Sequence, residues 1–259
     1  MKIATWNVNS IKARLENAER WLKDFQPDVV CMQEIKCIDD NFPSQVFEDL
    51  GYNVAVHGQK TYNGVALLSK TPMEDILIGL PGDESDDHAR FIEATITTES
   101  APVRVASLYL PNGNPTDTPK YPYKLAWMDR LITHAEDLLK TEEPFVLAGD
   151  YNVIPTDDDV WDPRAWWGDA LYRQETLDQY RRLTNLGLTD GFRTCHGQSH
   201  RYSFWDYQRG AWQKDHGIRI DHLLMSPQAA DRLKGADIDR SPRGWERPSD
   251  HTPVWVEID

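Results

Sequence analysis

The chain has 259 residues, with 42 acidic and 28 basic side chains and a formal net charge of −14. Apolar residues make up 40% and charged residues 27% of the chain, which excludes a disordered chain and a coiled coil. No run of 18 apolar residues and no apolar signal core occurs, so we expect neither a membrane span nor export. The three cysteines are odd in number and fit the reducing cytoplasm rather than a disulfide framework. We expect one domain over residues 1–259.

The acidic balance stands against a nucleic-acid partner, because non-specific DNA binding normally draws on a basic surface. An acidic protein can still bind DNA in two ways. Its basic residues can gather on one face, or its carboxylates can hold a divalent metal.

The first half of the chain alternates short apolar runs with helical stretches. Apolar spacing of three to four residues predicts a helix over residues 11–25, with Ser10 as its N-cap, and a short helix over 43–51. Asn63 and Gly64 predict the turn of a hairpin. Continuous or alternating apolar runs predict strands over 2–8, 28–34, 52–58, 64–70, 90–97 and 102–110.

The second half begins with a loop over 111–119 and a predicted helix over 120–140. A surface excursion dense in Asp and Trp is expected over 156–175. The remaining predicted helices are 175–186 and 227–234, and the remaining strands are 144–152, 202–207, 219–226 and 253–258. Many strands with interspersed helices indicate an α/β sandwich whose helices cover the outer faces of sheets.

Polar side chains lie in or directly beside several of the predicted buried strands. They are Asn7, Glu34, Asp150, Asn152, Asp221, Asp250 and His251. Burying carboxylates is costly unless something compensates them, so we expect these groups to meet at one edge of the fold around a cation. Carboxylate and amide oxygens suit Mg²⁺ or Mn²⁺ rather than zinc. A metal, an acid, a base and an amide donor are the parts needed to hydrolyse a phosphodiester.

Each of these residues also has an ordinary structural reading. An Asn at a strand end is usually a turn former, and a lone Asp in an apolar strand is more often exposed on its polar face. An Asp-His pair before a strand can be a cap or turn pair. The joint pattern favours the functional reading over any single member.

Seven segments carry a resemblance to a known family: WNVNS, QEIK, GQKTYNGVALLSK, YLPNG, GDYN, RIDHLLMS and PSDHTPVW. In their order and spacing, from residue 1 to residue 255, they resemble the motifs of the exonuclease III family of apurinic/apyrimidinic endonucleases, in its bacterial branch. This family belongs to the endonuclease/exonuclease/phosphatase superfamily. The resemblance implies a four-layered, DNase I-like α/β sandwich with two packed, mostly antiparallel sheets flanked by helices.

The resemblance also implies a magnesium site, with manganese as the alternative ion. Its implied ligands are Asn7, Glu34, Asp150, Asn152, Asp250 and His251. Glu34 matches the principal ligand, with Asn7 beside it. Some family members have an acidic residue where this chain has Asn9, which leaves operation with one or two metals open.

Catalytic roles are implied for Tyr109, Asp150, Asn152, Asp221, Asp250 and His251. Tyr109 matches the tyrosine beside the scissile phosphate. Asp150 matches the residue that activates water or protonates the leaving group, and Asn152 the amide that stabilises the phosphorane. Asp221 matches the aspartate that orients His251, which has been read both as a general base and as a phosphate contact.

A small apolar pocket would accept a base-free sugar, which swings out of the helix at little cost. The family positions for this pocket are Phe204, Ile218 and Ile220, with Trp212 nearby. YSFWDY is equally an ordinary core strand. Candidate phosphate contacts are Lys36, Arg90, Lys120 and Lys124, each of which could instead be a solvated surface charge.

The implied activity is Mg²⁺-dependent hydrolysis of duplex DNA at abasic sites and 3′ ends. It combines abasic-site incision, 3′→5′ exonuclease and 3′-phosphatase or phosphodiesterase activity in a proportion that the sequence leaves open. A monomer without an obligate protein partner or membrane fits the family. Segment 156–170 does not match it. The rivals are a superfamily enzyme for a phosphoinositide, sphingomyelin or a messenger-RNA tail, and a non-catalytic scaffold.

Overall fold

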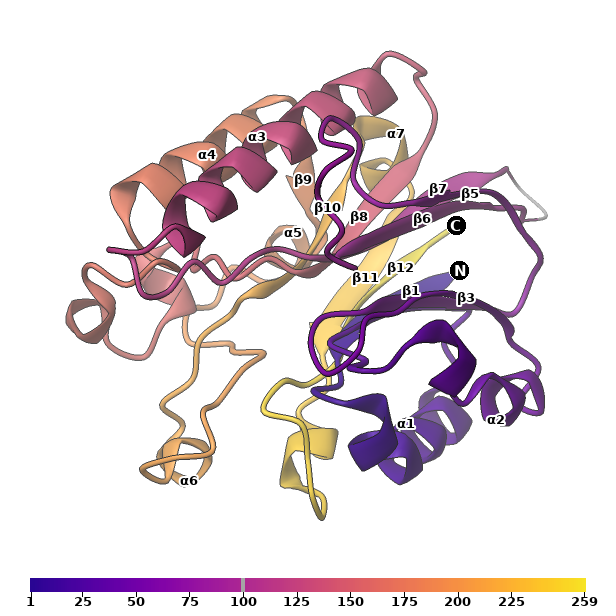
Figure 1. The fold of residues 1–259 in the computed structure, drawn as a ribbon, viewed down its shortest axis with the longest axis horizontal. Coiled ribbons are helices and arrows are strands. Elements are labelled where there is room, and N and C mark those ends of the chain that lie inside the picture. The colour runs from indigo at the N-terminus through magenta and orange to yellow at the C-terminus, as the bar shows by residue number, and fades with distance from the viewer. Residues whose placement is uncertain (99–100) are drawn as a thin grey trace.

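Two six-stranded sheets pack against each other in the computed structural model, which describes residues 1–98 and 101–259 (Figure 1). The first sheet has the order β11-β12-β1-β2-β4-β3, and the second has the order β5-β6-β7-β8-β10-β9. Strands β1 and β2 are parallel, as are β7 and β8, and the other paired strands are antiparallel. The mostly antiparallel pairing confirms the predicted fold class.

The strands of the first sheet are β1 (Lys2–Asn7), β2 (Val29–Gln33), β3 (Asn53–His57), β4 (Val65–Ser69), β11 (Leu233–Ile238) and β12 (Val254–Ile258). Those of the second are β5 (Met73–Ile78), β6 (Phe91–Ile96), β7 (Val103–Tyr109), β8 (Phe145–Asp150), β9 (Thr189–Asp190) and β10 (Asp221–Met225). The longer helices are α1 (Ile11–Phe25), α3 (Lys120–Leu139) and α4 (Gln174–Asn185). The shorter helices are α2 (Ser44–Glu48), α5 (Gly191–Cys195), α6 (Ala211–Lys214) and α7 (Pro227–Ala230).

The helices form the two outer layers. Figure 1 shows α1 and α2 over one sheet and α3 and α4 over the other. Alternate residues of β1 explain this packing: Ile3 faces the second sheet, whereas Ala4 and Trp6 pack with α1. Because inner strands such as β2 and β8 are buried on both faces, their sequences are nearly continuous apolar runs. Among the described residues, none of the helices is both long enough and apolar enough to cross a bilayer.

Four local predictions were wrong or incomplete. Residues 202–207 form no strand, and their backbone makes only isolated bridges at Phe204. The helix predicted over 227–234 ends at Ala230, because the chain turns there into β11. Ser10 has a φ of 84° and does not cap α1 with its side chain. The hairpin of β3 and β4 is confirmed, but its connection covers residues 58–64 rather than a two-residue turn.

The topology brings particular strand ends together. The carboxyl ends of the parallel pairs β1–β2 and β7–β8 carry Asn7, Gln33, Tyr109 and Asp150. Strand β10 is antiparallel to β8, and its first residue, Asp221, pairs with Asp150. Strand β12 is likewise antiparallel to β1, so the segment that precedes it returns to the same edge. One edge of the sandwich therefore collects polar side chains from both sheets.

Candidate active site

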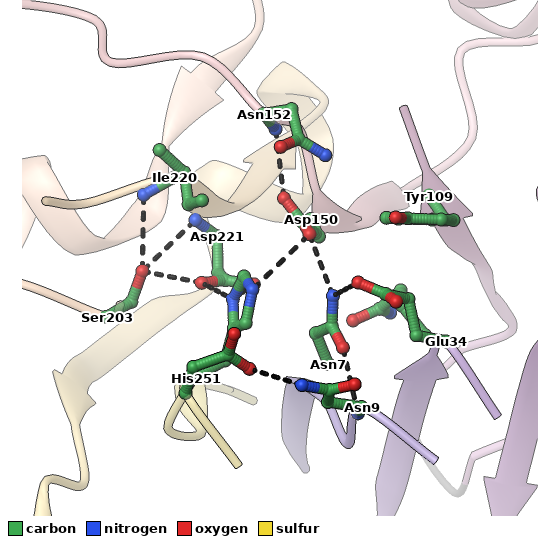
Figure 2. Close-up of polar contacts among 12 residues, drawn as sticks. Asn7, Asn9, Glu34, Tyr109, Asp150, Asn152, Ser203, Ile220, Asp221 and His251 are labelled. Carbon is green, nitrogen blue, oxygen red and sulfur yellow. Dashed lines mark hydrogen bonds and ion pairs between the residues drawn. The ribbon is translucent and has the colours of Figure 1, made fainter. Parts of the chain in front are cut away.

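Asn7 joins two carboxylates at this edge (Figure 2). Its side-chain nitrogen donates to Glu34 Oε1 at 2.8 Å and to Asp150 Oδ2 at 2.9 Å. Lys36 Nζ lies 2.9 Å from Glu34 Oε2. Burial opposes ionisation of Glu34, but Lys36 and the bond from Asn7 outweigh it and lower the pKa of this carboxyl. Glu34 is therefore a carboxylate at neutral pH.

His251 lies between two other carboxylates. Its Nδ1 is 2.8 Å from Asp221 Oδ2, and its Nε2 is 3.7 Å from Asp150 Oδ2. Burial disfavours the imidazolium, but Asp221 and Asp150 raise the pKa of His251 to about 10. Ser203 Oγ donates to Asp221 Oδ2 at 2.6 Å and so fixes the carboxylate that orients the imidazole.

The pKa of Asp150 shifts in the opposite direction from that of Glu34. It is 1% exposed, and burial raises its pKa to about 7 against the lowering effect of His251. The backbone N–H of Asn152 donates to Asp150 Oδ1 at 2.9 Å and holds the carboxyl in place. A carboxyl with such a pKa can accept or release a proton near neutral pH.

Glu34, Asp150 and His251 form a group whose candidate ligand atoms all lie within 4.8 Å of one another. Two hard carboxylates fit Mg²⁺ or Mn²⁺, which prefer oxygen ligands. His251 is less suited to a metal, because a ligating imidazole must be neutral and Asp221 favours its protonated form. Glu34 and Asp150 are thus the core of the possible metal site.

Two of the expected ligands are engaged elsewhere. Asp250 Oδ1 accepts a bond from Asn9 Nδ2 at 3.0 Å, outside the Glu34, Asp150 and His251 group. The side chain of Asn152 donates to the Leu110 carbonyl at 2.9 Å and accepts from Asn112 at 2.9 Å. Both side chains still border the site, since Asn152 follows Asp150 and Asp250 precedes His251.

Tyr109 lies at the end of β7 beside Glu34 and Asp150 (Figure 2). Burial and the two nearby carboxylates raise its pKa well above the usual range, so its hydroxyl stays protonated. The guanidinium of Arg90 stacks over the Tyr109 ring at 4.8 Å and donates to the Tyr109 carbonyl at 3.2 Å. A phenol donor and a cation therefore flank the carboxylates.

Comparison with known proteins decides the family. The family model described as Endonuclease/Exonuclease/phosphatase family matches residues 4–251. The chain belongs to this family. It is 35% identical to exodeoxyribonuclease III of Haemophilus influenzae, and the alignment covers 100% of both chains.

Two solved structures are similar over the whole chain. An AP endonuclease from Archaeoglobus fulgidus is 36% identical, with a TM-score of 0.95, and the match covers 100% of this chain and 99% of that one. A 3′ phosphatase from Neisseria bound to a product DNA hairpin is 38% identical, with a TM-score of 0.94 and the same coverage. The resemblance to the exonuclease III family is confirmed.

Two of the four residues expected to form the apolar pocket line a hollow in this chain. Phe204 and Ile218 line a hollow of about 490 Å³, and the Phe204 ring meets the His251 ring edge-on at 4.9 Å. Ile220 is buried nearby, in one cluster with Ile218. Trp212 was expected here but lies outside the hollow, because its ring packs on Trp205 at 4.8 Å.

The expected phosphate contacts divide into two groups. Lys36 and Arg90 flank the carboxylates, and Lys120 is exposed at the first turn of α3. The structure contradicts the expected contact of Lys124, which is completely buried and donates to the backbone carbonyls of Asn152 and Asn112. Burial lowers the pKa of Lys124 to about 7. Lys124 supports the Asn152 loop from within the protein.

Some neighbours of the site were not predicted. Trp161 and Trp166 line the same hollow as Phe204. They belong to the segment 156–170, whose density of Trp marked it as unusual but gave no position. Ser203 was also missed, because a serine between two aromatic residues has no signature that distinguishes it from a core position.

Proposed function

We propose that this chain is a metal-dependent DNA repair nuclease that hydrolyses phosphodiesters at abasic sites and 3′ ends of duplex DNA. The observation that carries the proposal is the group of Glu34, Asp150 and His251, within 4.8 Å, at the strand ends of a nuclease family fold. The related Neisseria enzyme, solved with a product DNA hairpin, supports DNA as the substrate.

Mg²⁺ is the proposed ion, with Mn²⁺ as a substitute, held by Glu34 and Asp150 beside Asn7. When bound, such an ion neutralises charge on the phosphate and lowers the pKa of water. Asp150, whose Oδ2 lies 3.7 Å from His251 Nε2, is placed to take the proton of the attacking water or deliver one to the leaving oxygen.

The surroundings of His251 favour one of its two proposed roles. An imidazolium held by Asp221 is a donor to a phosphate oxygen rather than a base. Tyr109, whose raised pKa keeps its hydroxyl protonated at neutral pH, is a second donor on the other side of Asp150. Asn152 takes a left-handed backbone conformation, with a φ of 48°, and its amide borders the site next to Asp150 while it donates to the Leu110 carbonyl.

We further propose one domain over residues 1–259 that acts as a monomer in the cytoplasm, without an obligate protein partner. Cys31, Cys37 and Cys195 are free thiols, which fits a reducing compartment.

Gel analysis of reaction products tests the proposed function directly. The substrates are duplexes with an abasic site, a 3′ phosphate or a recessed 3′ end, each incubated with Mg²⁺ or with EDTA. We expect incision or 3′ trimming of all three with Mg²⁺ and none with EDTA. A soluble phosphodiester is the comparison: cleavage of it in preference to DNA would support a different enzyme of the superfamily, and inactivity on every substrate would support a scaffold.

A further inference from the structure

The hollow beside His251 is larger and more aromatic than a base-free sugar requires. Its volume of about 490 Å³ lies within the range of sites that hold whole small molecules, about 300–1,000 Å³. Phe204 and Ile218 form the side next to the catalytic cluster, and Trp161 and Trp166 form the side that segment 156–170 contributes. The hollow therefore extends from Phe204, which contacts His251, toward two indole rings.

The tryptophan side is fixed to the catalytic side through the backbone. Val160 forms an isolated bridge with Ile218, and the Trp161 N–H donates to the Gly217 carbonyl at 3.1 Å. The rings of Trp161 and His216 stack at 3.9 Å with an interplanar angle of 6°. This wall is consequently preformed and needs no rearrangement to receive a ring.

A buried ion pair anchors the same segment. Asp159 is completely buried, and its Oδ1 lies 2.7 Å from the Nε of Arg219, also completely buried. Arg219 also bonds Asp190 at 2.8 Å and stands in the chain just before the catalytic Asp221. The position of the tryptophans is thus tied to the position of the active site.

The rim of the hollow adds positive charge. Arg209 and Lys214 line it and are exposed, and they outnumber Asp206, the one carboxylate in the lining. Aromatic surfaces combined with cations are how proteins hold unpaired nucleotides, because every base offers a face for stacking and every phosphate attracts a cation. A base-free sugar, in contrast, offers the indole rings no flat face on which to stack.

We propose, on the basis of the proposed nuclease function, that this hollow binds the base of an unpaired nucleotide at a 3′ end. Hydrolysis then forms a bond between water oxygen and phosphorus and breaks the bond from phosphorus to the 3′ oxygen of the preceding nucleotide. One water proton goes to that oxygen, and the products are a 5′-mononucleotide and a strand with a free 3′ hydroxyl. The segment 156–170 is in this way a specificity element for base-bearing ends.

The test compares three variants on two duplexes, one ending in an unpaired 3′ nucleotide and one ending in a 3′ phosphate. Trp166→Ala removes one of the two indole rings of this wall, and Trp166→Phe keeps an aromatic face at that position. Trp167→Ala is the matched control, because Trp167 is 75% exposed and lines a separate hollow. We expect Trp166→Ala to lower the rate on the unpaired nucleotide, relative to the rate on the 3′ phosphate, about tenfold or more. Trp166→Phe should restore most of this ratio, and Trp167→Ala should keep it.

An unchanged ratio in Trp166→Ala would overturn the proposal, whether both rates stay the same or both fall together. A binding measurement separates this proposal from the nuclease assignment. A duplex whose unpaired 3′ base is 2-aminopurine, titrated in Ca²⁺, should lose fluorescence on the wild type but not on Trp166→Ala. Such quenching by a protein that cleaves no DNA would retain the base site and reject the proposed nuclease activity. Equal fluorescence with both proteins would reject the base site.

Discussion

Glu34 and Asp150 have opposite pKa shifts although both contact the same amide of Asn7. The difference comes from their neighbours. Lys36 stabilises the charge of Glu34, while Asp150 lies deeper, where burial outweighs the attraction of His251. Without a metal, Glu34 is therefore charged at neutral pH, whereas Asp150 exchanges a proton near neutral pH.

Replacing Glu34 should therefore weaken metal binding more than it changes the chemistry. For Glu34→Gln we expect the Mg²⁺ concentration for half-maximal activity to rise about tenfold or more, with partial recovery of turnover at high Mg²⁺. A Mg²⁺ titration of the rate on the 3′-phosphate duplex measures this. An unchanged Mg²⁺ requirement would show that Glu34 is no ligand.

His222 follows Asp221 in β10, but its ring packs against Tyr151 and Tyr180, where it supplies a pH dependence of stability. Burial and the neighbouring Arg219 lower its pKa to about 4 from an ordinary value of 6.5. The folded state binds this proton less readily than the unfolded state, so the stabilising contribution is complete above pH 6.5. It declines as the pH falls from 6.5 toward 4, by up to about 1.4 kcal/mol per pH unit.

In His222→Gln, the decline in the free energy of unfolding that His222 causes between pH 6.5 and 4 should disappear. Urea unfolding of the variant and the wild type between pH 4 and 7 measures the two slopes. Equal slopes in His222→Gln and the wild type would contradict the assignment.

At the scale of elements, the sequence predicted the strands that are buried along their whole length. Strands such as β2 and β8 were recognised because both of their faces are covered, which requires apolar residues throughout. Edge strands β5 and β11 were missed, because MEDILI and LKGADI carry the charges that exposed edges tolerate.

The site was predictable to the same extent as the strands. Asn7 and Asp150 are the last residues of strands that the apolar runs predict. The sequence therefore also predicted that the two side chains meet at one edge. Lys124 was misplaced because lysine is rarely completely buried, and nothing local distinguishes a supporting lysine from an exposed one. The tryptophan wall depends on how a loop docks, which local sequence does not encode.

The docking of segment 156–170 gives a prediction of its own. Asp159→Asn leaves the buried guanidinium of Arg219 with less compensation, so we expect a loss of about 3 kcal/mol in the free energy of unfolding. Asp158→Asn, at an exposed neighbouring position, should stay within about 0.5 kcal/mol of the wild type. Chemical denaturation compares the two variants. Equal stabilities would show that the ion pair does not anchor the segment.

At the scale of the molecule, a net charge of −14 must be reconciled with a DNA substrate. The exposed or flanking cations near the site are Lys36, Arg90, Lys120, Arg209 and Lys214. A local basic face of this kind can hold phosphates even though the remaining surface is acidic.

Binding should then depend on salt. Three or four phosphate contacts would give a slope of log affinity against log salt of about −3 to −4. Lys120→Ala should reduce the slope by about one, whereas Lys140→Ala, roughly 30 Å away beyond the far end of α3, should not change it. Titration of a duplex in Ca²⁺ at several salt concentrations measures both. An affinity independent of salt would contradict the basic face.

We propose that one cluster around Asp150 performs hydrolysis both at abasic sites and at 3′ ends. The most direct test is the turnover of Asp150→Asn on abasic, 3′-phosphate and recessed-end duplexes, with the melting temperature measured in parallel. We predict a loss of roughly 10²- to 10⁴-fold on all three duplexes in a folded protein, because the amide cannot transfer the proton. Near-normal turnover on any one of them would contradict the claim that Asp150 serves a single site common to these reactions.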